Sequence, residues 1–285
     1  MSDAPRRPAR ITLRLRSTAP SRLALQAAVE AARALEQRLS SVFIESSELV
    51  SLAALSCARE VTVASRRGNA LTSERVEADL RLAAASAHRE LRQLAAMAGI
   101  DLDFEVVRDD PAAALERALE PGALLALDEP FHPGDAVRLS HLLNEVEEIA
   151  GALITGPRSL RRRGPVVVAI EDAERAPALL TVADRLQTEV HQGIVLVLIG
   201  DTPERIRTLH SAIGRLPQRD RPIEFAHAQI ARAAAGRGSA GVLAEAVIRY
   251  QGSFAIAHLG RLIRAREREL TVLSQTLECP LLLLK

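Results

Sequence analysis

A glycine-rich turn is the first feature of this sequence that could do chemistry. The stretch "AAAGRGSAGV" contains the spacing G-x-G-x-x-G at Gly236, Gly238 and Gly241. It lies between a run typical of a strand and a run typical of a helix, which is the context in which such glycines hold phosphate groups. Two hypotheses follow for this stretch: an anion contact at a helix N-terminus, or a turn with a structural role.

Two other groups of polar residues directly follow apolar runs. Glu171 and Asp172 come after "PVVVAI", and an acid in this place could meet a ribose hydroxyl. His258, Gly260 and Arg261 come at and after the end of "GSFAIA". Ligands of doubly wound sheets bind at the carboxyl ends of the strands, so we expect these residues to face a cleft.

The composition excludes several classes of function. The chain has 37 Lys and Arg residues against 36 Asp and Glu, so its net charge gives no case for nucleic acid as a partner. Cys57 and Cys279 lie far apart and no C-x-x-C occurs, so we expect neither a metal site nor a redox pair. No apolar run approaches the length of a membrane span, and we expect a cytoplasmic protein without an integral membrane segment. No G-x-S-x-G, H-E-x-x-H or P-loop lysine motif is present, and we expect no catalytic residue.

Strand-like and helix-like runs alternate in the same order in both halves of the 285 residues. This alternation predicts an α/β fold with a parallel sheet in each of two domains, 10–156 and 165–285, joined by the charged stretch "RSLRRRGP". The predicted strands cover 10–16, 40–45, 100–108, 122–130 and 151–157 in the first half, and 165–172, 193–201, 221–230, 252–260 and 279–285 in the second. Helices are predicted between them, including one over 111–121 and a long one over 261–278.

The first half is longer because of an insertion after its second strand. This insertion, Ser46–Thr72, contains a segment from Glu48 to Glu60 that is predicted to form an amphipathic helix. Two roles are open for it: covering an end of the sheet, or providing a lid or a partner surface.

Several stretches resemble the universal stress protein family in its tandem, two-domain form. They are "VVVAIEDAERAPALLTVADRLQ" and "LTVLSQTLECPLLLLK" in the second half, and "RALEQRLSSVFIES", "FEVVRDDPAAALERAL" and "GALITG" in the first. The resemblance covers residues 10–285 and implies two doubly wound parallel five-stranded sheets. Members of this family pair through their last strands. Pairing of Ala152–Thr155 with Leu281–Leu284 would therefore make one chain an internal pseudo-dimer, and a further homodimer stays open.

The resemblance also implies a nucleotide site from which this chain departs. ATP-binding members carry an Asp after the first strand and a loop G-x2-G-x9-G-[S/T] after the fourth. Here Arg16 stands in place of that Asp in the first half. In the second half, the position of the closing G-[S/T] pair falls near Glu267 and Arg268, whose side chains fill the space where bare backbone is needed.

We therefore expect a regulatory protein of a stress or energy response. It would bind a protein partner or small ligand and no cofactor. The alternative is a binder of ATP or AMP, or a slow ATPase, that uses only the second half. Its site would combine the acids and loop residues above with the glycine turn, as follows: Glu171, Asp172, His258, Gly260, Arg261, Gly236 and Gly238. A third alternative is a peripheral regulator of a membrane transporter.

Overall fold

A computed structural model describes most of the chain. The described residues are 10–15, 21–61, 68–109, 122–128, 139–144, 149–155, 164–187, 193–215, 223–229, 238–260, 264 and 266–285. The strands of the main sheet are β1 (Arg10–Leu15), β2 (Arg38–Ser46), β5 (Leu102–Asp109), β6 (Leu124–Asp128), β7 (Gly151–Thr155), β8 (Val166–Ile170), β9 (Ile194–Gly200), β10 (Ile223–Gln229), β11 (Phe254–His258) and β12 (Leu281–Leu284). The main helices are α1 (Arg22–Ala34), α3 (Ser73–Ala98), α6 (Ala176–Gln187), α7 (Pro203–Ile213), α8 (Gly238–Arg249) and α9 (Glu267–Thr276).

The two halves of the chain form one continuous sheet. Its ten strands run in the order β10-β9-β8-β11-β12-β7-β6-β1-β2-β5, and neighbours are parallel except at the centre. Within each half the first strand lies in the middle, with the second and third strands on one side and the fourth and fifth on the other. This is the doubly wound arrangement expected, and the predicted α/β fold class is confirmed.

The central contact of the sheet is antiparallel. Leu281 lies opposite Ile154 and Leu284 lies opposite Gly151, so the last strands of the two halves pair as expected. Both strands consist almost entirely of apolar residues that are buried in the sheet. An unpaired edge of this composition would expose backbone groups and apolar side chains together, which explains why these two strands join.

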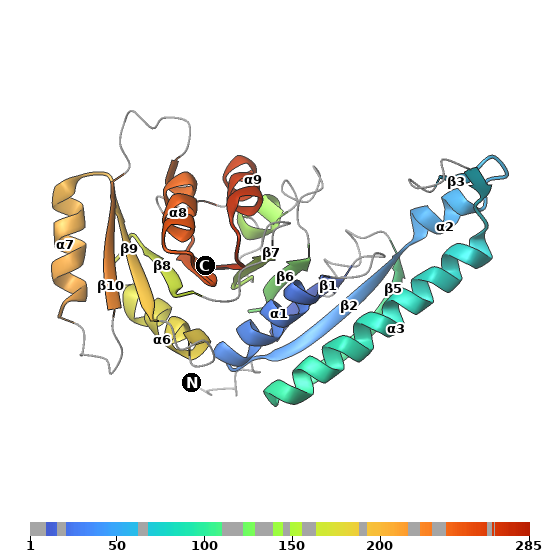
Figure 1. Cartoon of the computed structure of the whole chain (residues 1–285), viewed down its shortest axis with the longest axis horizontal. Coiled ribbons are helices and arrows are strands. Elements are labelled where there is room, and N and C mark those ends of the chain that lie inside the picture. Colours follow the sequence, from blue (N-terminus) through green and yellow to red (C-terminus); the bar gives the residue numbers. More distant parts are fainter. Residues whose placement is uncertain are drawn as a thin grey trace, which may run out of the picture.

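Helices cover both faces of the sheet (Figure 1). The buried sides of α1, α3, α6 and α7 pack on one face, and those of α8, α9 and the helical residues 139–144 pack on the other. Side chains alternate between the faces along each strand: Val166, Val168 and Ile170 point to the first, and Val167 and Ala169 to the second. No helix in the described part of the chain combines the length and the apolar character needed to cross a membrane.

The structure of the insertion, Ser46–Thr72, differs from the amphipathic helix that the sequence predicts. The helix expected over Glu48–Glu60 ends early, as α2 (Ser47–Ala53), and is followed by a two-stranded antiparallel sheet of β3 (Arg59–Val61) and β4 (Gly68–Ala70). Val61, a β-branched residue, favours a strand over a helix at this point. In Figure 1, α2 and β3 lie at the distal end of α3, away from the helices of the second half.

A second correction concerns the region before the last helix. The helix predicted over 261–278 begins only at Glu267, because Arg266 has extended backbone angles and Arg264 lies in the preceding loop. The backbone N–H of Arg264 donates to the Glu269 carboxylate at 3.1 Å, so the loop is held by a side chain of the first helical turn. The predicted helix over 111–121 lies outside the described residues, as does most of the linker.

Candidate functional site

The candidate site is a cavity of about 440 Å³ in the second half. It opens at the carboxyl ends of β8, β9 and β11. The strand order reverses at β8: the chain continues from β8 to β9 and β10 on one side, and then returns to β11 and β12 on the other side. Such a switch point leaves a crevice between diverging helices. The cavity is lined by Glu171, Asp172, Arg175, Leu179, Asp201, Arg205, His258, Leu259 and Gly260.

The turn after β8 supplies the first acids. Glu171 and Asp172 directly follow Ile170, the last buried residue of the strand. The Asp172 carboxylate accepts the backbone N–H of Glu174 at 3.0 Å, which fixes a tight turn of the kind that Asp favours. The turn leads into α6 and leaves Arg175 at the cavity wall.

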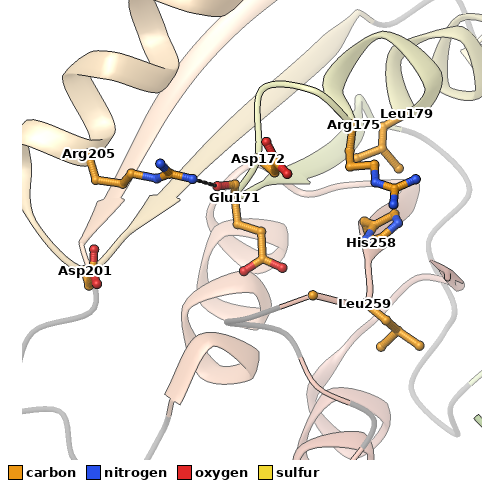
Figure 2. Close-up of a pocket in the computed structure, with 9 residues that line it drawn as sticks. Glu171, Asp172, Arg175, Leu179, Asp201, Arg205, His258 and Leu259 are labelled. Atoms are coloured by element: carbon orange, nitrogen blue, oxygen red, sulfur yellow. Dashed lines mark hydrogen bonds between the residues drawn. The ribbon is translucent and has the colours of Figure 1, made fainter. Parts of the chain in front are cut away.

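The turn after β9 supplies an acid and a cation. Thr202 is the N-cap of α7, and its hydroxyl accepts the backbone N–H of Arg205 at 3.2 Å. Asp201, one residue earlier, lines the cavity. The Arg205 guanidinium donates to the backbone carbonyl of Glu171 at 3.3 Å, which links the ends of β8 and β9 (Figure 2).

His258 enters the cavity from the end of β11. Figure 2 shows the Arg175 guanidinium next to its ring. Burial lowers the pKa of His258 from its ordinary value of 6.5, and the positive charge of Arg175 lowers it further. Contacts with the backbone of Leu259 and Lys285 and the charge of Asp172 oppose this effect. His258 Nε2 is buried and has no hydrogen-bond partner among the described residues.

Glu171 and Gly260 are in close contact across the cleft. The Glu171 side chain extends toward the loop after β11 (Figure 2), and a Cβ atom at Gly260 would collide with its Oε1. The lack of a side chain at Gly260 therefore makes room for a carboxylate of this chain. Farther along the same loop, the Glu269 carboxylate accepts a backbone N–H, that of Arg264. Two acids, Glu171 and Glu269, thus lie against the backbone of this loop.

The cavity has mixed charge. Three carboxylates, those of Glu171, Asp172 and Asp201, lie in its wall with two guanidinium groups and the histidine. This lining offers both donors and acceptors to a polar ligand but no dominant positive field. Within the described ranges, no cluster of His, Cys, Asp or Glu has an arrangement that could hold a metal ion.

The structure brings together four of the candidate residues. Glu171, Asp172, His258 and Gly260 line one cavity, although they come from segments almost ninety positions apart. Gly238 is the first residue of α8 and is not among the described residues that line it. Gly236 and Arg261 lie outside the described residues, as do Arg16 and most of the corresponding loop of the first half.

Sequence analysis missed five lining residues: Arg175, Leu179, Asp201, Arg205 and Leu259. Asp201 carried a usable signal, because it follows the end of the buried strand β9 just as Glu171 follows β8. Arg205 and Leu179 project from helices, and only the packing of α7 and α6 against the sheet brings them to the cavity.

The comparisons with known proteins concern the fold. No protein-family model and no curated protein matches this chain. Among solved structures, it is similar to a universal stress protein from Archaeoglobus fulgidus DSM 4304, with a TM-score of 0.57 and 11% identity over 96% of this chain and 96% of that one. It is also similar to a protein of Pseudomonas aeruginosa UCBPP-PA14 that is assigned as a universal stress protein, with a TM-score of 0.56 and 14% identity over 98% of this chain and 93% of that one. The likeness confirms the fold that the resemblance implied.

Proposed function

We propose that this chain, which has the fold of universal stress proteins, is a non-catalytic regulatory protein that does not hold ATP in the manner of the ATP-binding members. Its second-half cleft would bind a small polar ligand or part of a protein partner. The mixed charge of the cleft suits a ligand that carries both hydrogen-bond donors and acceptors.

One observation carries this proposal: the Glu171 carboxylate lies against Gly260. Phosphate groups bind to glycine-rich loops because bare backbone N–H groups can approach them closely. A carboxylate in that place excludes the phosphate by volume and repels it by charge. The Glu269 carboxylate, which accepts the N–H of Arg264, supports the same interpretation.

Binding of Mg-ATP to the wild-type chain and to Glu171→Ala tests the proposal. We expect no saturable binding to the wild type by native mass spectrometry or calorimetry, and weak binding to Glu171→Ala, because the substitution removes the competing carboxylate. Glu204→Ala is the matched control, since Glu204 is an exposed acid of α7 that pairs with Arg207 at 2.8 Å. The control should behave as the wild type does.

The alternative is a nucleotide-binding protein or slow ATPase that uses the second half. The observation in its favour is the placement of Arg175 and Arg205 in the same cavity, where guanidinium groups could meet phosphate. It predicts the opposite direction of change: the wild type binds one ATP per chain, and Glu171→Ala weakens binding. Nucleotide that copurifies with the wild-type chain would also support this alternative.

A further inference from the structure

The ten-stranded sheet ends in two outer strands, β10 and β5 (Figure 1). In the described part of the chain, β5 pairs with β2 on its inner side, and no strand pairs with its outer side. An outer strand presents a row of backbone N–H and C=O groups to any chain that can lie beside it. The outer side of β5 is therefore a candidate surface for pairing with another strand.

β5 lacks the features that usually prevent such pairing. Its sequence "LDFEVVRD" spans eight residues without Lys, Pro or Gly, the residues that most often repel or interrupt a neighbouring strand. Two of its charged residues have partners within the chain: Asp103 pairs with Arg10 at 3.0 Å, and Arg108 pairs with Glu77 at 2.8 Å. Because these charges are already compensated, they oppose a second strand less.

An exposed valine lies in the middle of β5. Phe104 stacks on His88 of α3 with ring centroids 4.4 Å apart, and Arg108 forms an ion pair with α3, so both side chains point to the α3 face. Val106 points to the same face, because alternate residues of a strand lie on one side of the sheet. Its side chain is nevertheless 47% exposed, since α3 does not cover it.

The other outer strand, β10, differs in this respect. Its large apolar residues, Ile223 and Phe225, are half-buried against the rest of the chain. Of the two outer strands, β5 is therefore the one that presents an exposed large apolar side chain together with its backbone edge.

A two-fold axis through Val106 gives an antiparallel pairing of two β5 strands that suits these side chains. Residues directly opposite each other in antiparallel strands point to the same face of the sheet. On the α3 face, Val106 then lies opposite Val106 of the second copy, and Arg108 lies opposite Phe104. On the other face, Glu105 lies opposite Val107. No like charges meet among these central residues.

The neighbouring registers are less favourable. An axis through Glu105 places that carboxylate opposite its own copy, and an axis through Val107 places Glu105 opposite Asp109. Like charges directly opposite each other destabilise a pair of strands. In the register centred on Val106, the acids that meet are Asp103 and Asp109 at the ends of the strand, and the first of these already has an arginine partner. The charge pattern of β5 therefore favours one register.

We propose that a second copy of this chain docks on the outer edge of β5, as an antiparallel strand pair centred on Val106. The sheets of the two copies become continuous, and the two exposed valines cover each other at the axis. The paired segment has eight residues per copy, which is small for an interface, so the dimer forms at micromolar rather than nanomolar protein concentration. This contact does not depend on the function proposed above.

Disulfide cross-linking tests both the dimer and its register. Residues opposite each other in an antiparallel pair have Cα atoms about 4.5–5.5 Å apart, which is within the range of a disulfide. Val106→Cys should therefore give a covalent dimer on mild oxidation, measured by non-reducing electrophoresis. The background is Cys57→Ser, because Cys57 is exposed and Cys279 is buried. Glu105→Cys in the same background is the matched control and should stay largely monomeric, because its side chain lies opposite Val107.

A charge at the axis tests the non-covalent dimer. Sedimentation equilibrium of the wild type should show a dimer whose fraction rises with protein concentration. Val106→Lys should weaken dimerisation about ten-fold or more, because two ammonium groups meet at the axis. Ile248→Lys is the matched control, since Ile248 is a 43% exposed residue of α8 in the second half. It should dimerise as the wild type does, and a melting curve establishes that each variant is folded.

Three results would overturn the proposal. They are a wild type that stays monomeric at high micromolar concentration, a dimer that Val106→Lys leaves intact, and equal cross-linking of Val106→Cys and Glu105→Cys. In the second case, loss of the dimer in Leu52→Lys would place the contact on the insertion instead, where Leu52 is 51% exposed.

Discussion

At the scale of single residues, a few side chains set the shape and charge of the second-half cleft. The segments at the ends of β8, β9 and β11 bring Glu171, Arg205 and His258 to one cavity. The direction of each side chain decides which groups it contacts. Glu171 extends to Gly260, Arg205 turns to the backbone of Glu171, and His258 keeps one buried nitrogen without a described partner. These directions support the proposal that the cleft accepts a polar ligand and opposes a phosphate at Gly260.

His258 makes stability depend on pH. Its pKa is lowered in the folded chain, so the unfolded chain binds a proton more readily, and acid favours unfolding. The free energy of unfolding should fall as the pH decreases below the ordinary value of 6.5, until the lower pKa of the folded state is reached. Urea unfolding across this range should show a flatter dependence for His258→Gln than for the wild type.

The control for this prediction is His141→Gln, since His141 is an exposed histidine on the helical segment 139–144. It should retain the wild-type slope. An unchanged slope in His258→Gln would contradict the assignment of this pH dependence to the buried ring.

At the scale of elements, α3 joins two separate cores. Its middle and C-terminal parts contribute Ala84, Ala87 and Leu91 to the main core under the sheet. Its N-terminal half forms a small cluster with α2, in which Ala53, Val76 and Leu80 are buried. Val50 and Leu71 pack against this cluster, whereas Leu49, Leu52 and Leu55 of α2 and the following turn are exposed. The insertion therefore depends on α3 rather than on the sheet for its packing.

Leu80→Ala should loosen the insertion without unfolding the sheet. Hydrogen exchange should become faster in α2, β3 and β4, while the protection of β1 and β2 stays near that of the wild type. Leu91→Ala is the comparison, because this fully buried residue lies in the main core and its truncation should cost about 2–5 kcal/mol of global stability. Faster exchange throughout the sheet of Leu80→Ala would contradict two separate cores.

An ion-pair network ties α3 to the sheet. Arg108 at the end of β5 contacts the Glu45 carboxylate of β2 at 2.9 Å and the Glu77 carboxylate of α3 at 2.8 Å. Hydrogen bonds to Glu45 and then Glu77 raise the pKa of Arg108. Glu45 is only 7% exposed, so the guanidinium compensates a carboxylate that water barely reaches.

Arg108→Met should lower the urea midpoint of unfolding, because it leaves the buried Glu45 carboxylate without this partner. Arg38→Met removes a pair of similar type at the opposite end of the same strands, where Arg38 and Asp101 are 65% and 77% exposed. Exposed pairs add little to stability, so this variant should unfold close to the wild-type midpoint. Equal midpoints for the two variants would contradict a special role for Arg108.

At the scale of the whole molecule, the two halves share their cores. Leu282 of β12 and Leu153 of β7 pair in register and lie in the same cluster as residues of α1 and α6. On that face, the Arg185 side chain also reaches the first half, with a hydrogen bond to Ala34 O at 3.2 Å and an ion pair with Glu36 at 3.1 Å. The contact between the halves is therefore part of the folded core.

Leu282→Ala should destabilise both halves together. The residue is fully buried, and its truncation should cost about 2–5 kcal/mol of global stability. Hydrogen exchange should accelerate in β1 and β6 of the first half as well as in β8 and β11 of the second. Acceleration confined to the second half would mean that the two units unfold independently.

The sequence by itself determined the kinds and order of most elements, because strand and helix formation depends on local hydrophobic periodicity. Buried runs such as "GIVLVLIG" and "CPLLLLK" placed the strands to within a few residues, and the acids after β8 were recognisable as site candidates. The fold class followed from the alternation, and the strand order from the family resemblance.

Only the tertiary structure decided how the sites are composed. α9 begins at Glu267, and the Glu269 carboxylate of its first turn accepts the backbone N–H of Arg264 in the preceding loop, a contact that helix propensity does not contain. Arg205 reaches the cavity because the packing of α7 against the sheet brings distant segments together. Glu171 and Gly260 follow two neighbouring strands, β8 and β11, and are in contact. This contact depends on the direction of the Glu171 side chain, and hydrophobic periodicity does not specify that direction.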